Sequence, residues 1–271
     1  MSSKIALCLY GKYNNRLSYH TGDDGFKYIF NVLLRKYDID IFFHSWDVNK
    51  KNKILGRYKP YLKKYKFENQ KDFKEVIKKR NINEQLFNPA NNESFRGLSN
   101  SLSFFYSRKR AIEIKQSYED HNNMSYPITI VARFDLGQID KYNGYFPYKV
   151  SEINFNPEFD MNYIYSAMWN QLNCGYADQW FYSNSNLIGH LVYMYDYALD
   201  ALQENSVYLQ HITSGLLDSN KHDEFSNEIF KSDGFKSKDR VIYKKSQAIN
   251  NHLMHKCFFI DNDLYKKSRF V

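Results

Sequence analysis

Three short apolar runs, each ending in polar residues, dominate the hydrophobic pattern of the first half of the chain. They are residues 5–10 (IALCLY), residues 39–43 (IDIFF) and the run that contains Ile128, Ile130 and Val131. Apolar and β-branched runs of this length are typical of strands that are buried on both faces. We therefore expect three buried strands, the last of them in the centre of a sheet.

Helical spacing lies between the first two runs. Apolar residues recur at i, i+3, i+4, i+7 and i+8 from Phe26 onwards. This spacing predicts an amphipathic helix that runs to about Lys36, with Asp23 or Asp24 as its N-cap. A strand, a helix and a strand within the first 45 residues predict a βαβ unit with parallel strands.

A long helix is predicted over residues 98–118, directly before the central strand. Leu102, Phe105 and Ile112 would point inward, with basic side chains around them: Arg108, Lys109, Arg110 and Lys115. A clear helical pattern covers residues 185–203. Weaker patterns predict strands at 152–155, 160–165 and 257–260, helices at 70–79 and 246–255, a lysine-rich loop before residue 70 and a polar, loop-dominated stretch at 204–245.

No repeat, low-complexity tract or linker divides the chain. Its 271 residues, 43% of them hydrophobic, suffice for one large α/β domain with a sizeable core. The sequence thus predicts a single α/β domain over residues 1–271, with a mixed, mostly parallel sheet flanked by helices. The net charge of +8 suggests anionic partners, although codon bias in a low-GC genome would also raise lysine.

The three cysteines, Cys8, Cys174 and Cys257, have no CxxC spacing. A sparse, odd set predicts free thiols in a reducing compartment instead of a disulfide framework or zinc site. The N-terminal apolar run is too short for a signal peptide, and no run approaches the ~20 residues of a spanning helix. We expect a soluble, cytoplasmic protein whose basic surface permits peripheral membrane contact.

Charged residues follow the central strand at once, in the order Arg133, Phe134, Asp135. Ligands of open α/β sheets bind at the carboxyl ends of the strands, and alternation places Arg133 and Asp135 on one face. The pair could bind a diphosphate, directly or through a divalent cation. An ion pair that closes the strand exit explains the pattern equally well.

Four stretches in order resemble a group of bacterial and viral sugar transferases of the GT-A type. They are ALCLYG followed by Arg16, DIDIFFHSWD, YSRKRAIEI leading to ITIVARFDL, and ADQWFYSNS, which cover roughly residues 4–200. The resemblance implies a GT-A-like domain, with a nucleotide-binding half at 1–140 and an acceptor-side half at 141–271. It also implies transfer of a sugar from a nucleoside-diphosphate sugar to a glycan, glycoconjugate or other hydroxyl acceptor.

The resemblance also implies roles for residues of the nucleotide-binding half. Gly11 and Arg16 would lie at the nucleotide pocket, whereas His44 and Asp47 would lie near the base and ribose. Two further basic residues, Arg108 and Lys109, would approach the diphosphate. A glycine at a strand end also lets the backbone approach a ligand closely, and neither a P-loop nor GxGxxG is present.

Arg133 and Asp135 resemble this family's version of the metal-binding DxD motif, in which two carboxylates hold Mn²⁺ or Mg²⁺. Arg133 replaces the first carboxylate, so either Asp135 holds the metal with diphosphate oxygens and water, or Arg133 neutralises the diphosphate directly. Asp178 would face the sugar or acceptor as the candidate catalytic base. His252 is a candidate for a phosphate or metal contact.

Simpler interpretations stay open at several positions. Asp178 could cap a helix in which Trp180 and Phe181 pack inward. The aromatic residues near it could stack on a sugar or fill the core: Trp169, Tyr176, Trp180 and Tyr182. His252 and His255 could face one site or an exposed helical surface. At the level of function, the alternatives are a basic nucleic-acid-binding module and an inactive nucleotide-binding protein of the same fold, but no nucleic-acid-binding signature is present.

Overall fold

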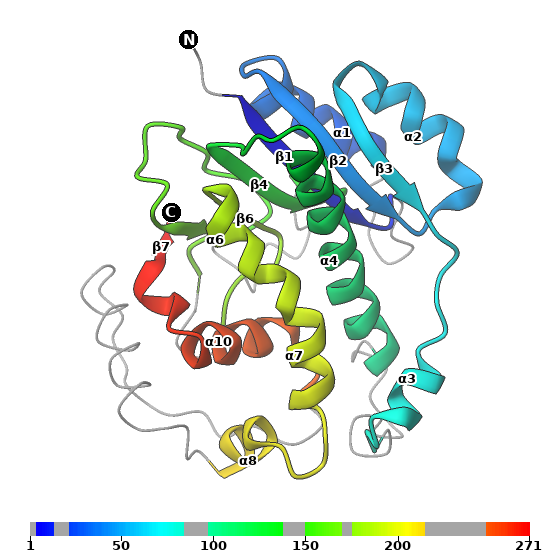
Figure 1. Ribbon diagram of the computed structural model, residues 1–271, viewed down its shortest axis with the longest axis vertical. Helices are drawn as coiled ribbons and strands as arrows, with labels where there is room; N and C mark the ends of the chain where they lie inside the picture. The colour runs from blue at the N-terminus through cyan, green and yellow to red at the C-terminus, as the bar shows by residue number, and fades with distance from the viewer. Residues whose placement is uncertain (1–3, 14–21, 84–96, 138–149, 170–174, 215–247) are drawn as a thin grey trace, which may run out of the picture.

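A computed structural model describes residues 4–13, 22–83, 97–137, 150–169, 175–214 and 248–271. Its described strands form one seven-stranded sheet in the order β3-β2-β1-β4-β6-β5-β7 (Figure 1). The strands are β1 (Ile5–Gly11), β2 (Ile39–Ser45), β3 (Leu62–Phe67), β4 (Ile128–Arg133), β5 (Ile164–Ser166), β6 (Trp180–Ser183) and β7 (Ser268–Phe270).

The sheet is mixed and mostly parallel. β3, β2, β1 and β4 run parallel to one another, whereas β6 is antiparallel to both β4 and β5. β7 pairs in parallel with β5. The predicted α/β class, the three buried strands and the parallel βαβ unit are therefore confirmed.

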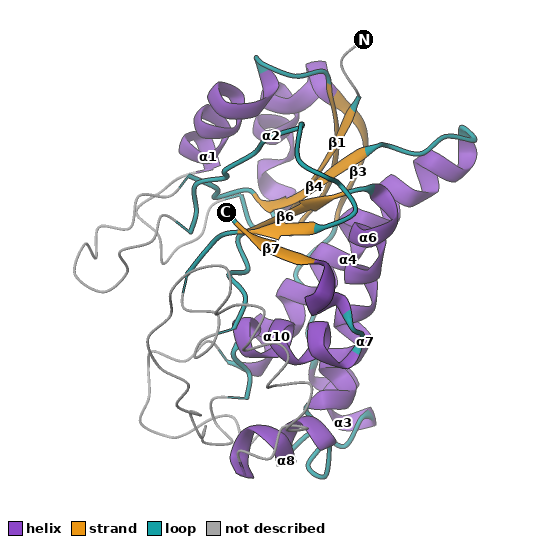
Figure 2. Ribbon diagram, turned by 90° about the vertical axis from the view of Figure 1, so that its left-hand side faces the viewer, coloured by secondary structure: helices purple, strands orange, loops and turns teal. Residues whose placement is uncertain are grey.

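Helices cover both faces of the sheet (Figure 2). One face packs on α1 (Gly22–Ile29), which continues as a π-helical turn to Leu34, and on α2 (Lys51–Tyr58). The other face packs on α4 (Leu98–His121), α6 (Ser185–Gly189), α7 (Met194–Ala201) and α10 (Asn251–Asp261). Two further helices are α3 (Lys74–Lys79) and α8 (Val207–Ser214).

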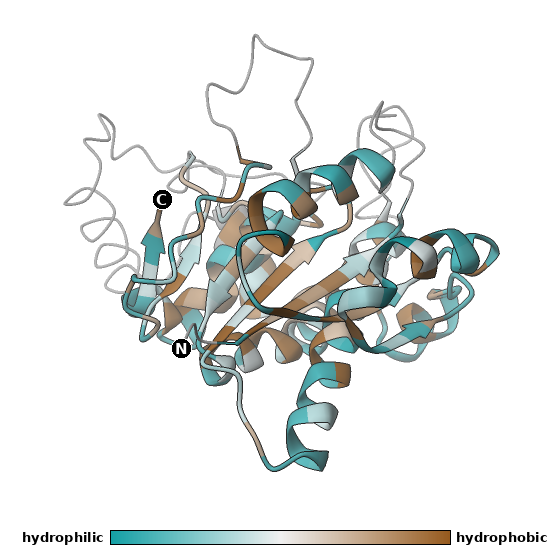
Figure 3. Cartoon of the chain, turned by 90° about the horizontal axis from the view of Figure 1, so that it is seen from above, coloured by the Kyte–Doolittle hydropathy of each residue, from teal (hydrophilic) through white to brown (hydrophobic). Residues whose placement is uncertain are grey.

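The alternation of side chains along β1 explains this two-sided core. Leu7 and Leu9 belong to the cluster under α1 and α2, whereas Ala6 and Cys8 belong to the cluster under α4 and α10. Each β1 residue from Ile5 to Tyr10 is at most 1% exposed. Figure 3 shows hydrophobic residues along the central strands of the sheet.

Five of the weaker predictions are wrong or incomplete. The lysine-rich segment predicted as a loop contains α2 and the edge strand β3, and residues 152–155 are not a strand. The strand predicted at 160–165 is limited to Ile164–Ser166, and the one predicted at 257–260 lies inside α10. The polar stretch at 204–245 contains α8.

Two basic residues of α4 are buried, contrary to the prediction that they surround the helix. Arg108 and Lys115 are both 0% exposed. Lys115 donates to Glu119 Oε2 at 2.8 Å and also to Ser185 Oγ, so its charge is paired within the core. The surroundings of Arg108 belong to the candidate site.

Cys8 and Cys257 are buried and not in a disulfide, as predicted, and Cys174 lies outside the described residues. Burial raises the pKa of each of the two buried thiols to about 12. Within the described ranges, no helix combines the length and apolar character needed to cross a bilayer.

Candidate functional site

The carboxyl ends of β1 and β4 lie side by side. Tyr10 pairs in register with Arg133, and the chain places β2 on one side of β1 but β4 on the other. Such a reversal of strand order is a topological switch point, where open α/β sheets bind their ligands. Arg133 therefore lies at the carboxyl end of the parallel strands, where a ligand crevice is expected.

Arg133 and Asp135 form a two-point ion pair. Arg133 Nε donates to Asp135 Oδ1 at 2.8 Å, and Nη2 donates to Oδ2. The Arg133 side chain is 12% exposed and that of Asp135 is 4% exposed. Burial lowers the pKa of Arg133, but Asp135 and Asp178 outweigh this effect and raise the pKa above its ordinary value. The guanidinium therefore stays charged beside a largely buried carboxylate.

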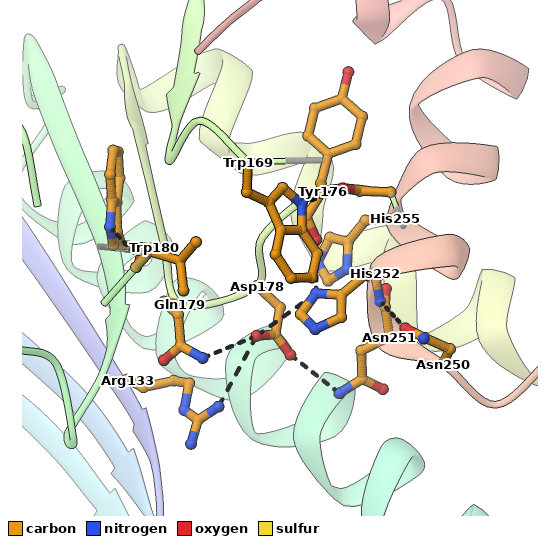
Figure 4. A network of polar contacts seen from close by, with 12 residues as sticks. Arg133, Trp169, Tyr176, Asp178, Gln179, Trp180, Asn250, Asn251, His252 and His255 are labelled. Carbon is orange, nitrogen blue, oxygen red and sulfur yellow. Dashed lines mark hydrogen bonds and ion pairs between the residues drawn. The ribbon is translucent and has the colours of Figure 1, made fainter. Parts of the chain in front are cut away.

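Asp178, on the segment that leads into β6, joins this pair. Its Oδ1 lies 3.9 Å from Arg133 Nη1 and 3.9 Å from His252 Nδ1. Two amides also donate to the carboxylate, Gln179 Nε2 to Oδ1 and Asn251 Nδ2 to Oδ2, each at 3.3 Å. Figure 4 shows the four side chains around Asp178. Residues from β4, from the β6 entry and from the start of α10 thus meet at one carboxylate.

A close backbone approach holds His252 in place. Gly175 has φ +85°, and a Cβ there would lie 2.0 Å from the His252 carbonyl oxygen, so the position requires glycine. His252 Nδ1 bonds to the Tyr176 carbonyl at 2.8 Å. Because a carbonyl only accepts, Nδ1 carries the proton. The Trp169 ring packs edge-on at 4.6 Å against His252, which is 27% exposed.

A buried layer lies beneath Asp178. The Tyr10 hydroxyl donates to the Asp178 carbonyl at 3.0 Å, and Arg108 Nη1 donates to His255 Nε2. His255 Nδ1 must then donate to the Asn251 carbonyl, at 2.5 Å. Burial, helped by the Arg108 charge, holds the pKa of His255 well below its ordinary value. His255 is therefore a neutral link between Arg108 and the start of α10.

Several buried polar atoms around Asp178 have no hydrogen-bond partner among the described residues. They are Arg108 Nε and Nη2, Gln179 Oε1 and Asn251 Oδ1. Buried polar atoms in folded proteins are nearly always paired, with protein or with water. Arg108 is compensated mainly by aromatic faces, with its guanidinium carbon 5.4 Å from the rings of both Phe104 and Phe105. The surroundings of Asp178 are thus less completely paired than an ordinary core.

His44 and Gly11, which the resemblance places at the nucleotide site, form a separate group with Ser107. His44 is 0% exposed, with Nδ1 2.7 Å from Ser107 Oγ and Nε2 3.4 Å from Glu68 Oε2. Burial lowers the pKa of His44 to about 4. Gly11 has φ +99°, and its N–H donates to the same Ser107 Oγ at 2.8 Å. This geometry joins β1, β2 and α4 and gives His44 a structural role.

Of three further residues of the expected site, two lie within the described part of the chain. Asp47 accepts a hydrogen bond from the Tyr13 N–H at 2.6 Å. Lys109 points to α7, where it pairs with Asp196 Oδ2 at 2.6 Å. Arg16 lies outside the described residues. Among the expected residues, the structure therefore brings Arg133, Asp135 and Asp178 together and directs Lys109 to a different surface.

The alternatives left open around Asp178 are largely resolved. The helix-cap interpretation is wrong, because Trp180 and Phe181 lie in β6. Tyr176, Trp180 and Tyr182 are each at most 1% exposed and belong to the core. The prediction that a partly exposed helical face explains both histidines is wrong for His255, which is buried.

The prediction of Mn²⁺ or Mg²⁺ at Asp135 stays a prediction. Both Asp135 carboxylate oxygens accept bonds from Arg133. Hard cations require several oxygen ligands, and the described residues contain no group of three or more His, Cys, Asp or Glu side chains placed to hold a metal. This donor set does not fit a metal without rearrangement, so we derive no catalytic step through one.

Sequence reasoning missed Tyr10, Gln179 and Asn251 as members of the site. Gln179 and Asn251 are direct neighbours of Asp178 and His252, and that adjacency is the only signal the sequence offers. Tyr10 reads as one more apolar residue of the β1 run.

Comparisons of the chain with protein-family models, curated proteins and solved structures found no match.

Proposed function

We propose that the protein transfers a sugar from a nucleoside diphosphate to a hydroxyl acceptor. The observation that supports this most is the convergence of Arg133, Asp135 and Asp178 at the switch point between β1 and β4. The resemblance in the order of the sequence motifs supports it as well. A fixed cation beside two carboxylates, at a sheet edge suited to ligands, provides the charges that such a transfer needs.

Arg133 neutralises the diphosphate leaving group in this proposal. The new bond forms between the acceptor oxygen and the anomeric carbon, while the bond from that carbon to the diphosphate oxygen breaks and its electron pair leaves with the diphosphate. Asp135 fixes the orientation of the guanidinium through two contacts. Because the guanidinium is already oriented, little reorganisation is needed when negative charge develops.

Asp178 accepts the proton of the acceptor hydroxyl. Its carboxylate is held by Gln179 and Asn251 and lies 3.9 Å from both Arg133 and His252. A base must lie within hydrogen-bond reach of the proton it takes, so the proposal requires the acceptor hydroxyl to bind beside the Asp178 carboxylate. The partly exposed His252 lies on the same side and contacts the substrate.

Nucleotide binding tests the proposal. The wild-type chain should gain thermal stability with one of UDP, GDP, CMP or dTDP, measured with and without Mn²⁺. Arg133→Ala should weaken nucleoside-diphosphate binding roughly 10- to 100-fold and nucleoside binding far less, because charge-assisted hydrogen bonds go to the diphosphate. Calorimetric titration with both ligands measures the two losses.

A matched control is Arg80→Ala, which removes an exposed arginine that pairs with Asp200. It should leave both affinities unchanged. Equal losses of nucleoside and nucleoside diphosphate in Arg133→Ala would remove the diphosphate role. Stabilisation by oligonucleotides alone would favour a nucleic-acid-binding module, and nucleotide binding without turnover would favour an inactive member of the same fold.

A further inference from the structure

The basic residues of the chain are unevenly distributed. Residues 48–80 contain thirteen Lys and Arg but only three Asp and Glu, a net charge of +10. Since the whole chain carries +8, the rest of it carries −2. A general preference for lysine codons would raise lysine along the whole chain, so it does not account for a segment in which acidic residues are also scarce. Such asymmetry is typical of a surface that meets an anionic partner.

The structure places this segment along one edge of the sheet. It forms α2, the edge strand β3 and α3, which run down one side of the molecule (Figure 1). Twelve of the thirteen basic residues are exposed, and Lys50 is half-buried. We call these thirteen side chains the basic edge.

Most of the basic edge is not neutralised by the described part of the protein. Five side chains have carboxylate partners: Lys53 and Arg57 with Asp23, Lys63 with Asp40, Lys66 with Glu68, and Arg80 with Asp200. The other eight have no carboxylate within ion-pair distance among the described residues, and all are lysines: Lys50, Lys51, Lys59, Lys64, Lys71, Lys74, Lys78 and Lys79. A large uncompensated positive charge therefore faces solvent.

The chemistry of the basic edge favours a diffuse anionic surface over a defined phosphate site. Lysine is a hydrated point charge on a flexible stem, whereas arginine supplies the planar, two-point contacts of specific phosphate and base recognition. Two exposed apolar side chains, Val48 and Tyr65, lie within the segment at 40% and 41% exposure. Lysines interspersed with such residues are typical of surfaces that lie against a lipid interface.

A nucleic-acid strand fits these residues less well. Sequence-tolerant binding of single strands uses exposed aromatic faces on which bases stack. The Tyr65 ring is already stacked on Phe43, with centroids 5.4 Å apart and an interplanar angle of 25°. We propose that the basic edge docks the protein onto the surface of an anionic lipid bilayer. This proposal does not depend on the sugar-transfer chemistry.

Vesicle sedimentation with the full chain tests the proposal. Wild-type protein should sediment with vesicles of phosphatidylcholine and phosphatidylserine but not with phosphatidylcholine alone. Binding should fall as salt rises, because added salt shortens the distance over which charges attract. Each lysine close to an anionic bilayer contributes roughly a factor of five in partitioning. The triple variant Lys51→Glu, Lys59→Glu and Lys74→Glu should therefore lose at least about 100-fold.

The matched control reverses three exposed lysines outside the segment, as Lys27→Glu, Lys36→Glu and Lys267→Glu. Both triple variants change the net charge equally, and both should keep the wild-type thermal midpoint. The control should retain most of the vesicle binding. Equal losses in the two variants, equal binding to both kinds of vesicle, or binding to a DNA duplex without binding to vesicles would each overturn the proposal.

Discussion

The tips of β2 and β4 present similar kinds of polar side chain but differ in how these are paired. At the β2 tip, His44 lies between Ser107 and Glu68, and Glu68 also pairs with Lys66. At the β4 tip, three buried side chains around Asp178 carry polar atoms that have no partner among the described residues. The first group also contains one buried atom without a hydrogen-bond partner, His44 Nε2, which faces Glu68 Oε2 at 3.4 Å, whereas the second contains four such atoms.

This difference supports the proposed site. Unpaired buried polar atoms cost free energy that a ligand or water can recover, and among the described residues four such atoms lie around Asp178 against one at His44. The resemblance to sugar transferases suggested both groups as parts of one nucleotide site. The geometry instead favours the Asp178 group as the chemical centre and the His44 group as its support.

The largest expected effect comes from Asp135→Ala. Arg133 would lose its orienting partner, so turnover should fall about 100- to 1,000-fold, as when one preorganised electrostatic contact is removed. Circular dichroism and steady-state transfer assays measure fold and turnover separately. Asp200→Ala, which removes a carboxylate from an exposed ion pair, is the control. Wild-type turnover in Asp135→Ala would refute the site assignment.

Acid should destabilise the fold through the β2 tip. The pKa of His44 is lowered to about 4, against 6.5 in an unfolded chain, so between these values only the unfolded chain binds the proton. As the pH decreases from 6.5 to 4, this residue should lower the free energy of unfolding by up to about 1.4 kcal/mol per pH unit, or about 3 kcal/mol in total. The lowered pKa of His255 acts in the same direction. Urea unfolding at a series of pH values measures the slope.

Glu68 extends the acid sensitivity below this window. Burial raises its pKa, but Lys66, His44 and Tyr106 outweigh this and lower the pKa to about 2. Its contribution to stability is therefore present above its unfolded value of 4.5 and is lost as the pH falls towards 2. Stability that is flat between pH 7 and 4 would contradict the assignment of buried, neutral His44.

A smaller effect is expected from His44→Gln. Loss of the contacts to Ser107 and Glu68 should cost about 1–3 kcal/mol of unfolding free energy and should reduce the acid slope. Nucleotide affinity should change less than about twofold, since His44 is enclosed by protein. Denaturant titration and calorimetry give the two numbers. A tenfold loss of affinity with unchanged stability would return His44 to the nucleotide pocket.

The smallest stability effect should come from Arg108→Met. Replacing an incompletely paired buried ion with an apolar side chain of similar length is often neutral or stabilising, so we expect a change below about 1 kcal/mol. Turnover should nevertheless fall, because Arg108 orients His255 and, through Asn251, the Asp178 carboxylate. A loss of more than about 3 kcal/mol would show that Arg108 belongs to the structural core.

The strands that form the site were predictable because they are buried on both faces. β1 is an uninterrupted apolar run in the sequence, and β2 and β4 are largely apolar runs broken only by Asp40 and Thr129 before their polar ends. The charged residues after β4 follow directly from the sequence. β3 was missed because it is an edge strand with three lysines among its six residues, so it lacks an apolar pattern. The apolar run at 257–260 predicts a strand but lies inside α10, because short apolar runs occur in both buried helices and buried strands.

The residues that surround Arg133 and Asp135 were less predictable from the sequence than this pair itself. Arg133 and Asp135 are neighbours in sequence, so their ion pair follows from alternation along a strand. By contrast, Arg108, Asp178 and Asn251 are brought together by α4, the β6 entry and α10, which are distant in sequence. No spacing rule links such residues, and a single sequence does not reveal which buried arginine lacks a carboxylate partner.

The lysines of β3 also bear on how copies of the protein meet one another. β3 ends the sheet, and the open side of an end strand offers unpaired backbone groups that could template pairing with another chain. β3 carries three lysines, of which Lys63 and Lys66 pair with carboxylates and Lys64 has no carboxylate partner among the described residues. Lysines on an edge strand repel the same strand of a second copy and so oppose pairing between copies. High salt would weaken this repulsion, and self-association through β3 should then rise with ionic strength.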